Sequence, residues 1–155
     1  MICALGIKLC PTFRANYLHP ADLILFLVDT RVGPQPADRM LVKELYGQRT
    51  VLLRKGLSST PIILVANKAE TDKLRQQAQD PKWKALKLGL PMAISALTGQ
   101  GVGDLLDEIL KHLHQTKIGS IVNSQSSMVQ PDLRIAIIGK PNVGKSSLLN
   151  KILGE

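Results

Sequence analysis

The chain has 155 residues, of which 45% are hydrophobic and 21% charged, and its 20 Lys and Arg against 12 Asp and Glu give a formal net charge of +8. This composition excludes an intrinsically disordered tail, and no apolar run approaches the ~20 residues that a membrane-spanning helix requires. The positive charge suits RNA or another polyanion, but many basic surfaces are only solvated, so the charge alone defines no function.

The first residues of the chain carry little structural information. Both cysteines, Cys3 and Cys10, lie there, and two such thiols indicate neither a disulfide framework nor a zinc site, so a reducing compartment is expected. Lys8 and Arg14 with no nearby acid give a weak transit-peptide character. We leave residues 1–19 unassigned.

Strands and helices are predicted to alternate along most of the remaining chain. Continuous apolar runs predict four strands buried on both faces, at 21–28, 61–66, 92–94 and 133–138. Helical spacing predicts helices at 37–46, 71–79, 102–114 and from 145 onward. This alternation predicts an α/β fold with a mostly parallel sheet and flanking helices, whose ligands bind beyond the carboxyl ends of the strands.

Two details of the helices and connections can be tested. One apolar stripe of the helix at 102–114 is expected to face the core, and it consists of Val102, Leu105, Leu106, Ile109, Leu110 and Leu113. Residues 116–132 are rich in Ser, Asn and Gln, so we interpret them as a linker between two units.

A glycine-rich turn follows the last predicted strand. The turn runs Gly139-Lys140-Pro141-Asn142-Val143-Gly144-Lys145-Ser146, with Ser147 next, and matches the phosphate-loop pattern between a strand and a helix. Its backbone N–H groups would converge on phosphates, Lys145 would contact the outer phosphates, and Ser146 would ligate magnesium. The alternative is an ordinary glycine turn into a helix.

Two weaker signals follow the second and third predicted strands. Asn67-Lys68-Ala69-Glu70 places a carboxylate where it could accept the paired N–H donors of guanine, with Asn67 bracing the loop and the Lys68 stem along the base. The alternative is a charged helix start. Ser95-Ala96-Leu97 follows the third predicted strand, one strand after the Asn67 motif. Only this position suggests a role for the tripeptide, in which the Ala96 N–H could reach a base carbonyl.

Four segments together resemble the Der/EngA family of tandem-domain ribosome-assembly GTPases. They are ADLILFLVDTRVGPQPAD, PIILVANKAE, PMAISALTGQGVGDLLDEIL and RIAIIGKPNVGKSSLLNKILGE. Members of that family carry two GTP-binding domains followed by an RNA-binding domain of the KH type. The resemblance implies that residues 20–115 are the C-terminal half of the first GTPase domain and that residues 133–155 begin the second, so that the P-loop GTPase fold is incomplete.

The resemblance also implies a function. The expected ligands are GTP or GDP with magnesium at Ser146, and Asn142 corresponds to an asparagine that binds potassium in related GTPases. Guanine would contact Asn67, Lys68, Glu70, Ser95, Ala96 and Leu97, and the phosphates would contact Gly139, Asn142, Val143, Gly144, Lys145, Ser146 and Ser147. No residue is assigned as catalytic.

The expected partner is the large ribosomal subunit or its RNA, with no membrane or DNA, in a bacterial-type cytoplasm or the interior of a mitochondrion or plastid. Because the family's switch regions have no counterpart in this sequence, we expect this chain to bind nucleotide without hydrolysing it. A circularly permuted ribosome-assembly GTPase and a non-catalytic nucleotide- or RNA-binding fragment remain alternatives.

Two features of the sequence depart from the family pattern. Glu70 stands where the family usually has Asp, and residues 47–59 lengthen the connection before the second strand. In such GTPase domains the phosphate-loop strand lies beside the strand that here ends at Asp29. We therefore expect the four predicted strands to form one sheet, with Lys145 near Asn67.

Overall fold

The computed structural model describes residues 6–9, 21–54, 60–118 and 134–154. In these ranges the chain forms one five-stranded sheet, in which every neighbouring pair of strands is parallel. The order across the sheet is β1-β5-β2-β3-β4. The strands are β1 (Gly6–Leu9), β2 (Leu23–Asp29), β3 (Ile62–Asn67), β4 (Met92–Ala93) and β5 (Arg134–Gly139). The predicted α/β class with a parallel sheet and flanking helices, of the P-loop GTPase type, is confirmed.

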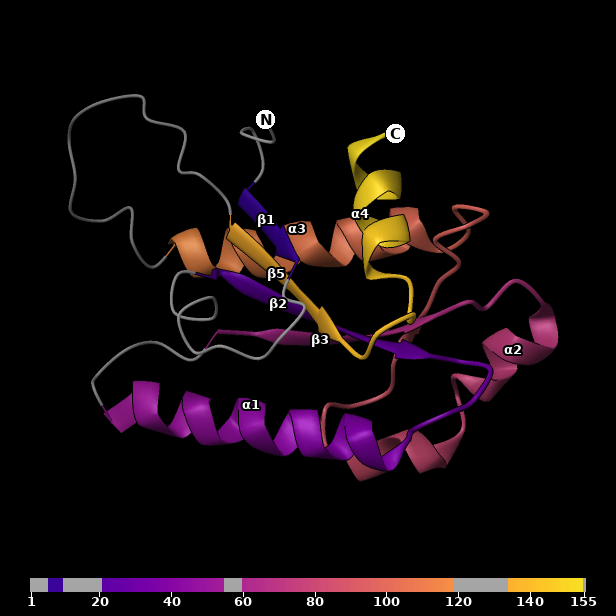
Figure 1. Ribbon diagram of the computed structural model, residues 1–155. Helices are drawn as coiled ribbons and strands as arrows, with labels where there is room; N and C mark the ends of the chain where they lie inside the picture. The colour runs from indigo at the N-terminus through magenta and orange to yellow at the C-terminus, as the bar shows by residue number, and fades with distance from the viewer. Residues whose placement is uncertain (1–5, 10–20, 55–59, 119–133, 155) are drawn as a thin grey trace.

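The last strand lies inside the sheet rather than at its edge (Figure 1). β5 pairs with β2 through a register that places Gly139 beside Leu27, and on its other side it pairs with β1. The expectation that the phosphate-loop strand lies beside the strand ending at Asp29 is therefore confirmed. All four predicted strands join one sheet.

β1 is a strand that the sequence did not reveal. It lies within the unassigned residues 1–19, where Gly6 pairs with Arg134. A run of four residues carries too little periodicity to predict a strand, and its partner is distant in sequence. Cys3 and Cys10 lie outside the described residues.

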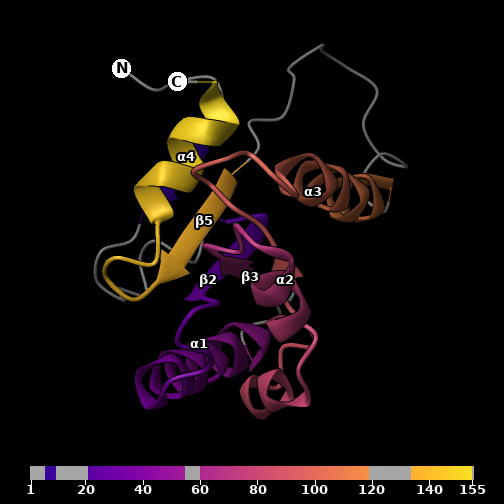
Figure 2. The same ribbon diagram turned by 90° about the vertical axis from the view of Figure 1, so that its right-hand side faces the viewer.

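Helices cover both faces of the sheet (Figure 2). One side carries α1 and the 3-10 helix η2, and the other carries α3 and α4. The helical elements are α1 (Pro36–Arg54), α2 (Asp72–Gln77), η2 (Pro81–Leu86), α3 (Val102–Ile118) and α4 (Lys145–Leu153). The sheet is thus buried on both faces, as the continuous apolar runs of its strands require.

Two helices extend beyond their predicted ends. The helix predicted at 37–46 continues to Arg54 through Gly47, because one glycine inside a helix costs only about 1 kcal/mol. It occupies much of the long connection noted at 47–59, of which residues 55–59 lie outside the described residues. The helix predicted at 102–114 continues to Ile118, so residues 116–118, which we had placed in the linker, are helical. The rest of the predicted linker lies outside the described ranges.

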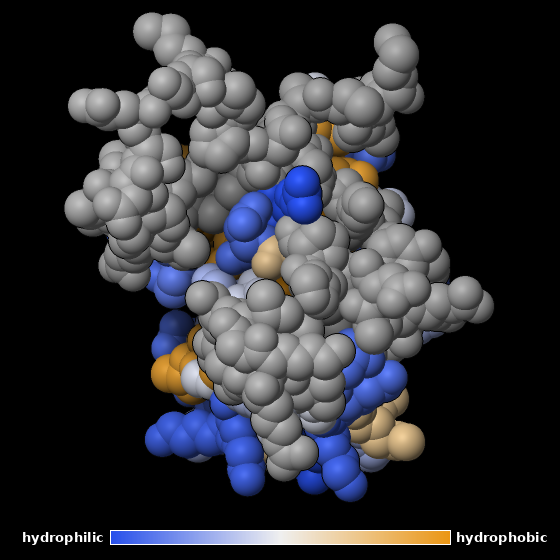
Figure 3. Space-filling model, turned by 90° about the vertical axis from the view of Figure 1, so that its left-hand side faces the viewer, coloured by the Kyte–Doolittle hydropathy of each residue, from blue (hydrophilic) through white to orange (hydrophobic). Residues whose placement is uncertain are grey.

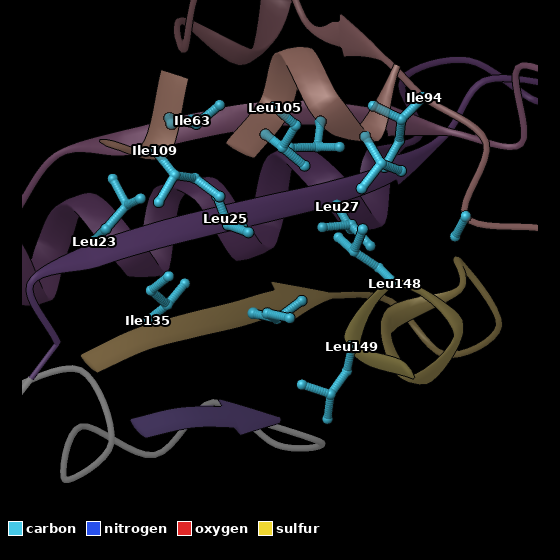
Figure 4. Close-up of a cluster of buried hydrophobic side chains, with 14 of the residues drawn as sticks. Leu23, Leu25, Leu27, Ile63, Ile94, Leu105, Ile109, Ile135, Leu148 and Leu149 are labelled. Atoms are coloured by element: carbon cyan, nitrogen blue, oxygen red, sulfur yellow. The ribbon is translucent and has the colours of Figure 1, made fainter. Parts of the chain in front are cut away.

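Alternate residues of each strand pack into two separate cores. Leu23, Leu25 and Leu27 of β2 point to the side of α3 and α4, where Leu105, Ile109 and Leu148 meet them (Figure 4). The intervening residues Ile24, Phe26 and Val28 pack on the opposite face with Val42 and Leu45 of α1 and Trp83 of η2. The period of two residues in a strand explains this division.

The predicted apolar stripe of α3 is only partly buried. Leu105 and Ile109 are at most 3% exposed, whereas Leu106 is 36% and Leu110 is 51% exposed. The stripe is wider than the surface that the sheet offers, so residues at its border remain near solvent. The Leu113 side chain lies outside the described residues.

The outer surface of α1 carries several charged residues, together with the exposed Met40. Arg39, Lys43 and Glu44 are exposed, and Figure 3 shows hydrophilic residues gathered on the lower part of the face, at the height of this helix. Within the described ranges, no helix is both long enough and apolar enough to cross a bilayer.

Candidate functional site

The polar motifs gather where the central strands end. Parallel pairing aligns Asp29 of β2 with Asn67 of β3, and Leu27 with Gly139 of β5. The predicted base motif and the predicted phosphate loop therefore lie at the same edge of the sheet. The two motifs are far apart in the sequence, and the pairing of β5 with β2 brings them together.

Close packing explains both glycines of the phosphate loop. A Cβ atom on Gly139 would lie 2.4 Å from the carbonyl oxygen of Leu27. Gly144 has a φ of +96°, and a Cβ there would lie 2.2 Å from Nδ2 of Asn67. Only glycine meets both conditions at position 144, a left-handed backbone and an immediate neighbour.

The phosphate loop leads into a helix without a side-chain cap and holds one partly buried lysine. The N-cap of α4 is Gly144, which has no side chain, so the first backbone N–H groups of this helix find no side-chain acceptor on the cap residue. Lys145 Nζ donates to the carbonyl oxygens of Gly139 at 2.8 Å and Lys140 at 2.7 Å. An ammonium group has three donors, so one remains for a ligand. Burial lowers the pKa of Lys145 from its ordinary value.

Asn67 joins the two motifs directly. Its side chain is buried, its Nδ2 donates to the carbonyl oxygen of Val143 at 2.8 Å, and its Oδ1 accepts from the backbone N–H of Ala96 at 2.9 Å. One amide thus connects the loop after β5, the end of β3 and the loop after β4. Asn67 thus contacts the backbone of two loops, and Lys145 lies in the same cluster of strand ends.

Lys68 and Glu70 are both held by the end of β2. Lys68 Nζ is 2.7 Å from Oδ2 of Asp29, and Glu70 Oε2 is 3.0 Å from Nη2 of Arg31. Burial pushes the pKa of Glu70 upward, but the hydrogen bond from Arg31, a backbone hydrogen bond, the charge of Arg31 and the Ser95 hydroxyl together hold it below its usual range. Glu70 therefore carries a negative charge at neutral pH.

The loop after β4 contributes two buried residues and one exposed residue. Ser95 is fully buried and its Oγ lies 3.4 Å from Glu70 Oε1. Ala96 is 5% exposed, and Asn67 occupies the N–H that the sequence analysis offered to a base carbonyl. Leu97 is 80% exposed.

Three of the remaining predicted phosphate contacts are exposed, and Val143 is buried. Asn142 is exposed with a φ of +63°, a conformation that asparagine tolerates better than most residues. Ser146 and Ser147 are exposed in the first turn of α4. Val143 is buried, so its side chain anchors the loop while its backbone faces Asn67.

Sequence reasoning missed three residues around the site. Asp29 and Arg31 pair with Lys68 and Glu70, and no motif marks that partnership in the sequence. Asp38 is completely buried in the first turn of α1, where Oδ2 accepts from the backbone N–H of Gln35 at 2.8 Å and pairs with Lys140 Nζ at 3.2 Å. The signal available for Asp38 was its position as an acid at a helix start, which is too common to be diagnostic.

The described part of the chain offers few side-chain ligands for a metal ion. Among the described residues, no group of three or more His, Cys, Asp or Glu side chains could hold a metal ion. Magnesium fits this donor set in another way, because it commonly takes one or two protein ligands and completes its shell with phosphate oxygens and water. Ser146, exposed beside the uncapped start of α4, is the residue that could supply such a ligand.

Comparison with known proteins supports the resemblance on which the sequence analysis relied. Residues 134–155 match a family model described as "50S ribosome-binding GTPase". The chain is 44% identical to GTPase Der of Herpetosiphon aurantiacus over 89% of its length, and 38% identical to GTPase Der of Staphylococcus haemolyticus over the same share. The resemblance to the Der family is confirmed along most of the chain.

The matches cover only part of the relatives. The chain spans 26% of the Herpetosiphon protein and 27% of the Staphylococcus protein, about a quarter of each. GTPase Der of Streptomyces coelicolor is 39% identical over 97% of this chain and 29% of its own length. That match extends into residues 1–19, which the motifs left unassigned.

Proposed function

We propose that this chain is a section of a Der-type GTPase and binds a guanine nucleotide in a composite site. One part of the site is the base motif at the ends of β3 and β4, and the other is the phosphate loop after β5. The observation that carries the proposal is the pair of hydrogen bonds made by Asn67, to Val143 at 2.8 Å and from Ala96 at 2.9 Å.

Each part of the site has a distinct task. The phosphates would meet the N–H groups at the start of α4 and the free donor of Lys145, with Gly139, Asn142, Val143, Gly144, Ser146 and Ser147 forming the rest of the cradle. The base would meet Glu70, which is charged and therefore accepts the paired N–H donors of guanine. A carboxylate left unpaired beside adenine would disfavour ATP.

The remaining base contacts are assigned by position. Asn67, Ser95 and Ala96 would hold the loops that surround the base, and Lys68 would lay its stem along the base plane. Leu97 would cover the base only if nucleotide binding orders its exposed side chain. We therefore expect Leu97 to contribute least among these six residues.

Magnesium and potassium are proposed as companions of the nucleotide. Ser146 would provide the magnesium ligand, and the Asn142 side chain would face potassium. Bound magnesium would neutralise phosphate charge. The residues of the chain itself bind and orient the nucleotide, and none of them is assigned a proton-transfer step.

Hydrolysis by the whole protein is proposed from its relatives, which are named GTPases. Phosphoryl transfer depends on groups that position water and stabilise charge. This sequence holds no counterpart of the family's switch regions, so we propose that the 155-residue chain alone binds nucleotide with negligible turnover.

A ribosomal partner is supported by charge and by the family model. The net charge of +8 favours contact with RNA phosphates, and the matched family model is described as ribosome-binding. We propose the large ribosomal subunit or its RNA as the partner, and a bacterial-type cytoplasm or an organelle interior as the location.

Titration with fluorescent GDP tests the composite site. The chain should bind GDP, and Lys145→Ala should weaken binding at least tenfold because a charge-assisted phosphate contact is lost (about 1.4 kcal/mol per tenfold). Lys111→Ala removes an equally charged but exposed lysine of α3 and should leave the affinity unchanged. If Lys145→Ala binds GDP as tightly as the unsubstituted chain, the phosphate-loop role is rejected.

A further inference from the structure

The turn at the end of β2 contacts every polar member of the base motif. We call residues 29–31 the β2 turn. The backbone N–H and the hydroxyl of Thr30 donate to the carbonyl oxygen of Asn67, at 3.0 and 2.7 Å, and Asp29 pairs with Lys68 at 2.7 Å. Arg31 pairs with Glu70 at 3.0 Å. The β2 turn therefore acts as a template against which residues 67–70 are held.

Arg31 differs from the other two residues of the β2 turn. Thr30 is 1% exposed and its hydrogen bonds connect two core strands, so it has a clear part in folding. The Arg31 side chain is 56% exposed, and an ion pair this accessible contributes little to stability. We therefore consider how Arg31 affects the orientation of the Glu70 side chain rather than the stability of the fold.

We propose that Arg31 is a positioning residue that fixes the Glu70 carboxylate for recognition of guanine. The inference rests on the proposed function, since it assigns the geometry of that same site. Glutamate has one more rotatable bond than the aspartate that is usual in the family, and a freely rotating carboxylate loses more entropy when it accepts two hydrogen bonds. A guanidinium on one side and the Ser95 hydroxyl on the other restrict that rotation before the base arrives.

The carboxylate keeps room for the base while it is held. Two carboxylate oxygens offer about four lone-pair sites in all. Arg31 uses one site on Oε2 and Ser95 one on Oε1, at 3.0 and 3.4 Å. These two side-chain contacts leave one site on each oxygen; the backbone hydrogen bond at Glu70 lies at one of them, so the second N–H donor of guanine would replace that bond. Arg31 also opposes the effect of burial on the Glu70 pKa and so keeps the group ionised.

Two other roles of Arg31 would give different effects when the residue is removed. If Arg31 blocked Glu70 and had to leave before the base could bind, its removal would tighten guanine binding. If it served only the fold, its removal would change stability and would leave the preference among bases unaltered. The three roles therefore differ in a measurable ratio.

Competition of GDP and IDP against fluorescent GDP measures this ratio. IDP lacks the exocyclic amine, so it keeps one of the two donors that Glu70 would accept. We expect Arg31→Ala to weaken GDP about tenfold and IDP about twofold, which shrinks the preference for GDP about fivefold. Arg31→Lys, which keeps the charge, should recover part of the loss.

Arg75→Ala is the matched control. It removes an arginine from an ion pair with Asp72, on α2 and outside the site, and should change neither affinity. Thermal unfolding should show that Arg31→Ala is folded and melts at nearly the same temperature as the unsubstituted chain.

The outcomes separate the two proposals. If the unsubstituted chain binds no GDP, or binds it independently of Lys145, the proposed function fails and this inference fails with it. If binding depends on Lys145 but Arg31→Ala tightens GDP or leaves the GDP to IDP ratio unchanged, only the role of Arg31 is overturned.

Discussion

At the scale of single residues, the candidate site depends on close packing between the phosphate loop and the base motif. Gly144 leaves no room for a Cβ beside Asn67, and Asn67 uses both side-chain atoms to join two loops. Because buried amides are costly when unpaired, small changes at these positions should have effects on folding as well as on binding.

Gly144→Ala should destabilise the fold. The added Cβ would clash with Asn67 and the residue would keep a φ of +96°, so we expect a loss of about 2–4 kcal/mol in the free energy of unfolding. Gly103→Ala is the control, since it lies in α3 with no atom within 4 Å of the added methyl, and it should be neutral or slightly stabilising. Urea titration compares the two, and equal stabilities would contradict the close packing at Gly144.

The pH dependence of base recognition should reveal the Arg31 contact. In the unsubstituted chain the pKa of Glu70 lies below its usual range, so the carboxylate stays charged and the GDP to IDP ratio should be the same at about pH 5 and about pH 7. In Arg31→Ala, burial raises the pKa of Glu70 with less opposition, so the ratio should fall at the lower pH. Competition titrations at both pH values measure it, and a ratio independent of pH in Arg31→Ala would contradict this account.

At the scale of elements, an ion pair fastens the phosphate loop to α1. Asp38 is fully buried, and its Oδ1 has no hydrogen-bond partner in the described part of the chain, while Oδ2 faces Lys140 at 3.2 Å. The pair connects the first turn of α1 to the end of β5. Among the described residues, Lys140 supplies the positive charge that pairs with this buried carboxylate.

Lys140→Met should therefore destabilise the chain strongly. Removing one partner of a buried pair leaves an uncompensated charge, at a cost of about 3–5 kcal/mol. The double variant Asp38→Asn with Lys140→Met should recover most of that loss, because the neutral amide can still accept from Gln35. Lys82→Met breaks an exposed pair with Asp80 and should change stability by less than about 1 kcal/mol. Urea unfolding without nucleotide measures all three, and a small effect of Lys140→Met would refute the buried pair.

At the scale of the whole molecule, the segment after residue 133 completes the sheet. β5 pairs with strands on both sides, and Leu148 of α4 is fully buried in the core shared with β2 and α3 (Figure 4). The two cores lie on opposite faces of the same strands. Unfolding of one core should therefore carry the other with it.

Trp83 fluorescence can report this coupling. Leu148→Ala removes a buried side chain from one core and should lower stability by about 2–5 kcal/mol. Trp83, the single tryptophan, lies in the other core, so its unfolding transition should shift by the same amount. Met40→Ala changes a residue that is 72% exposed and should shift it little. An unshifted Trp83 transition in Leu148→Ala would mean that α4 and β5 fold apart from the rest.

The sequence by itself determined the alternation of strands and helices, the parallel sheet and the phosphate-loop motif. These depend on local apolar runs, on glycine spacing and on residues close together in the chain. Even β5 beside β2 followed from the family resemblance, since four separated segments agreed with one known arrangement.

Only the tertiary structure decided what depends on contacts across the sheet. The pairing of β1 with β5, the exposure of Leu106 and Leu110, and the partners of Glu70 and Asp38 all involve residues on different elements. Local periodicity holds no information about such partners, because a side chain is buried or paired by whichever distant element packs against it.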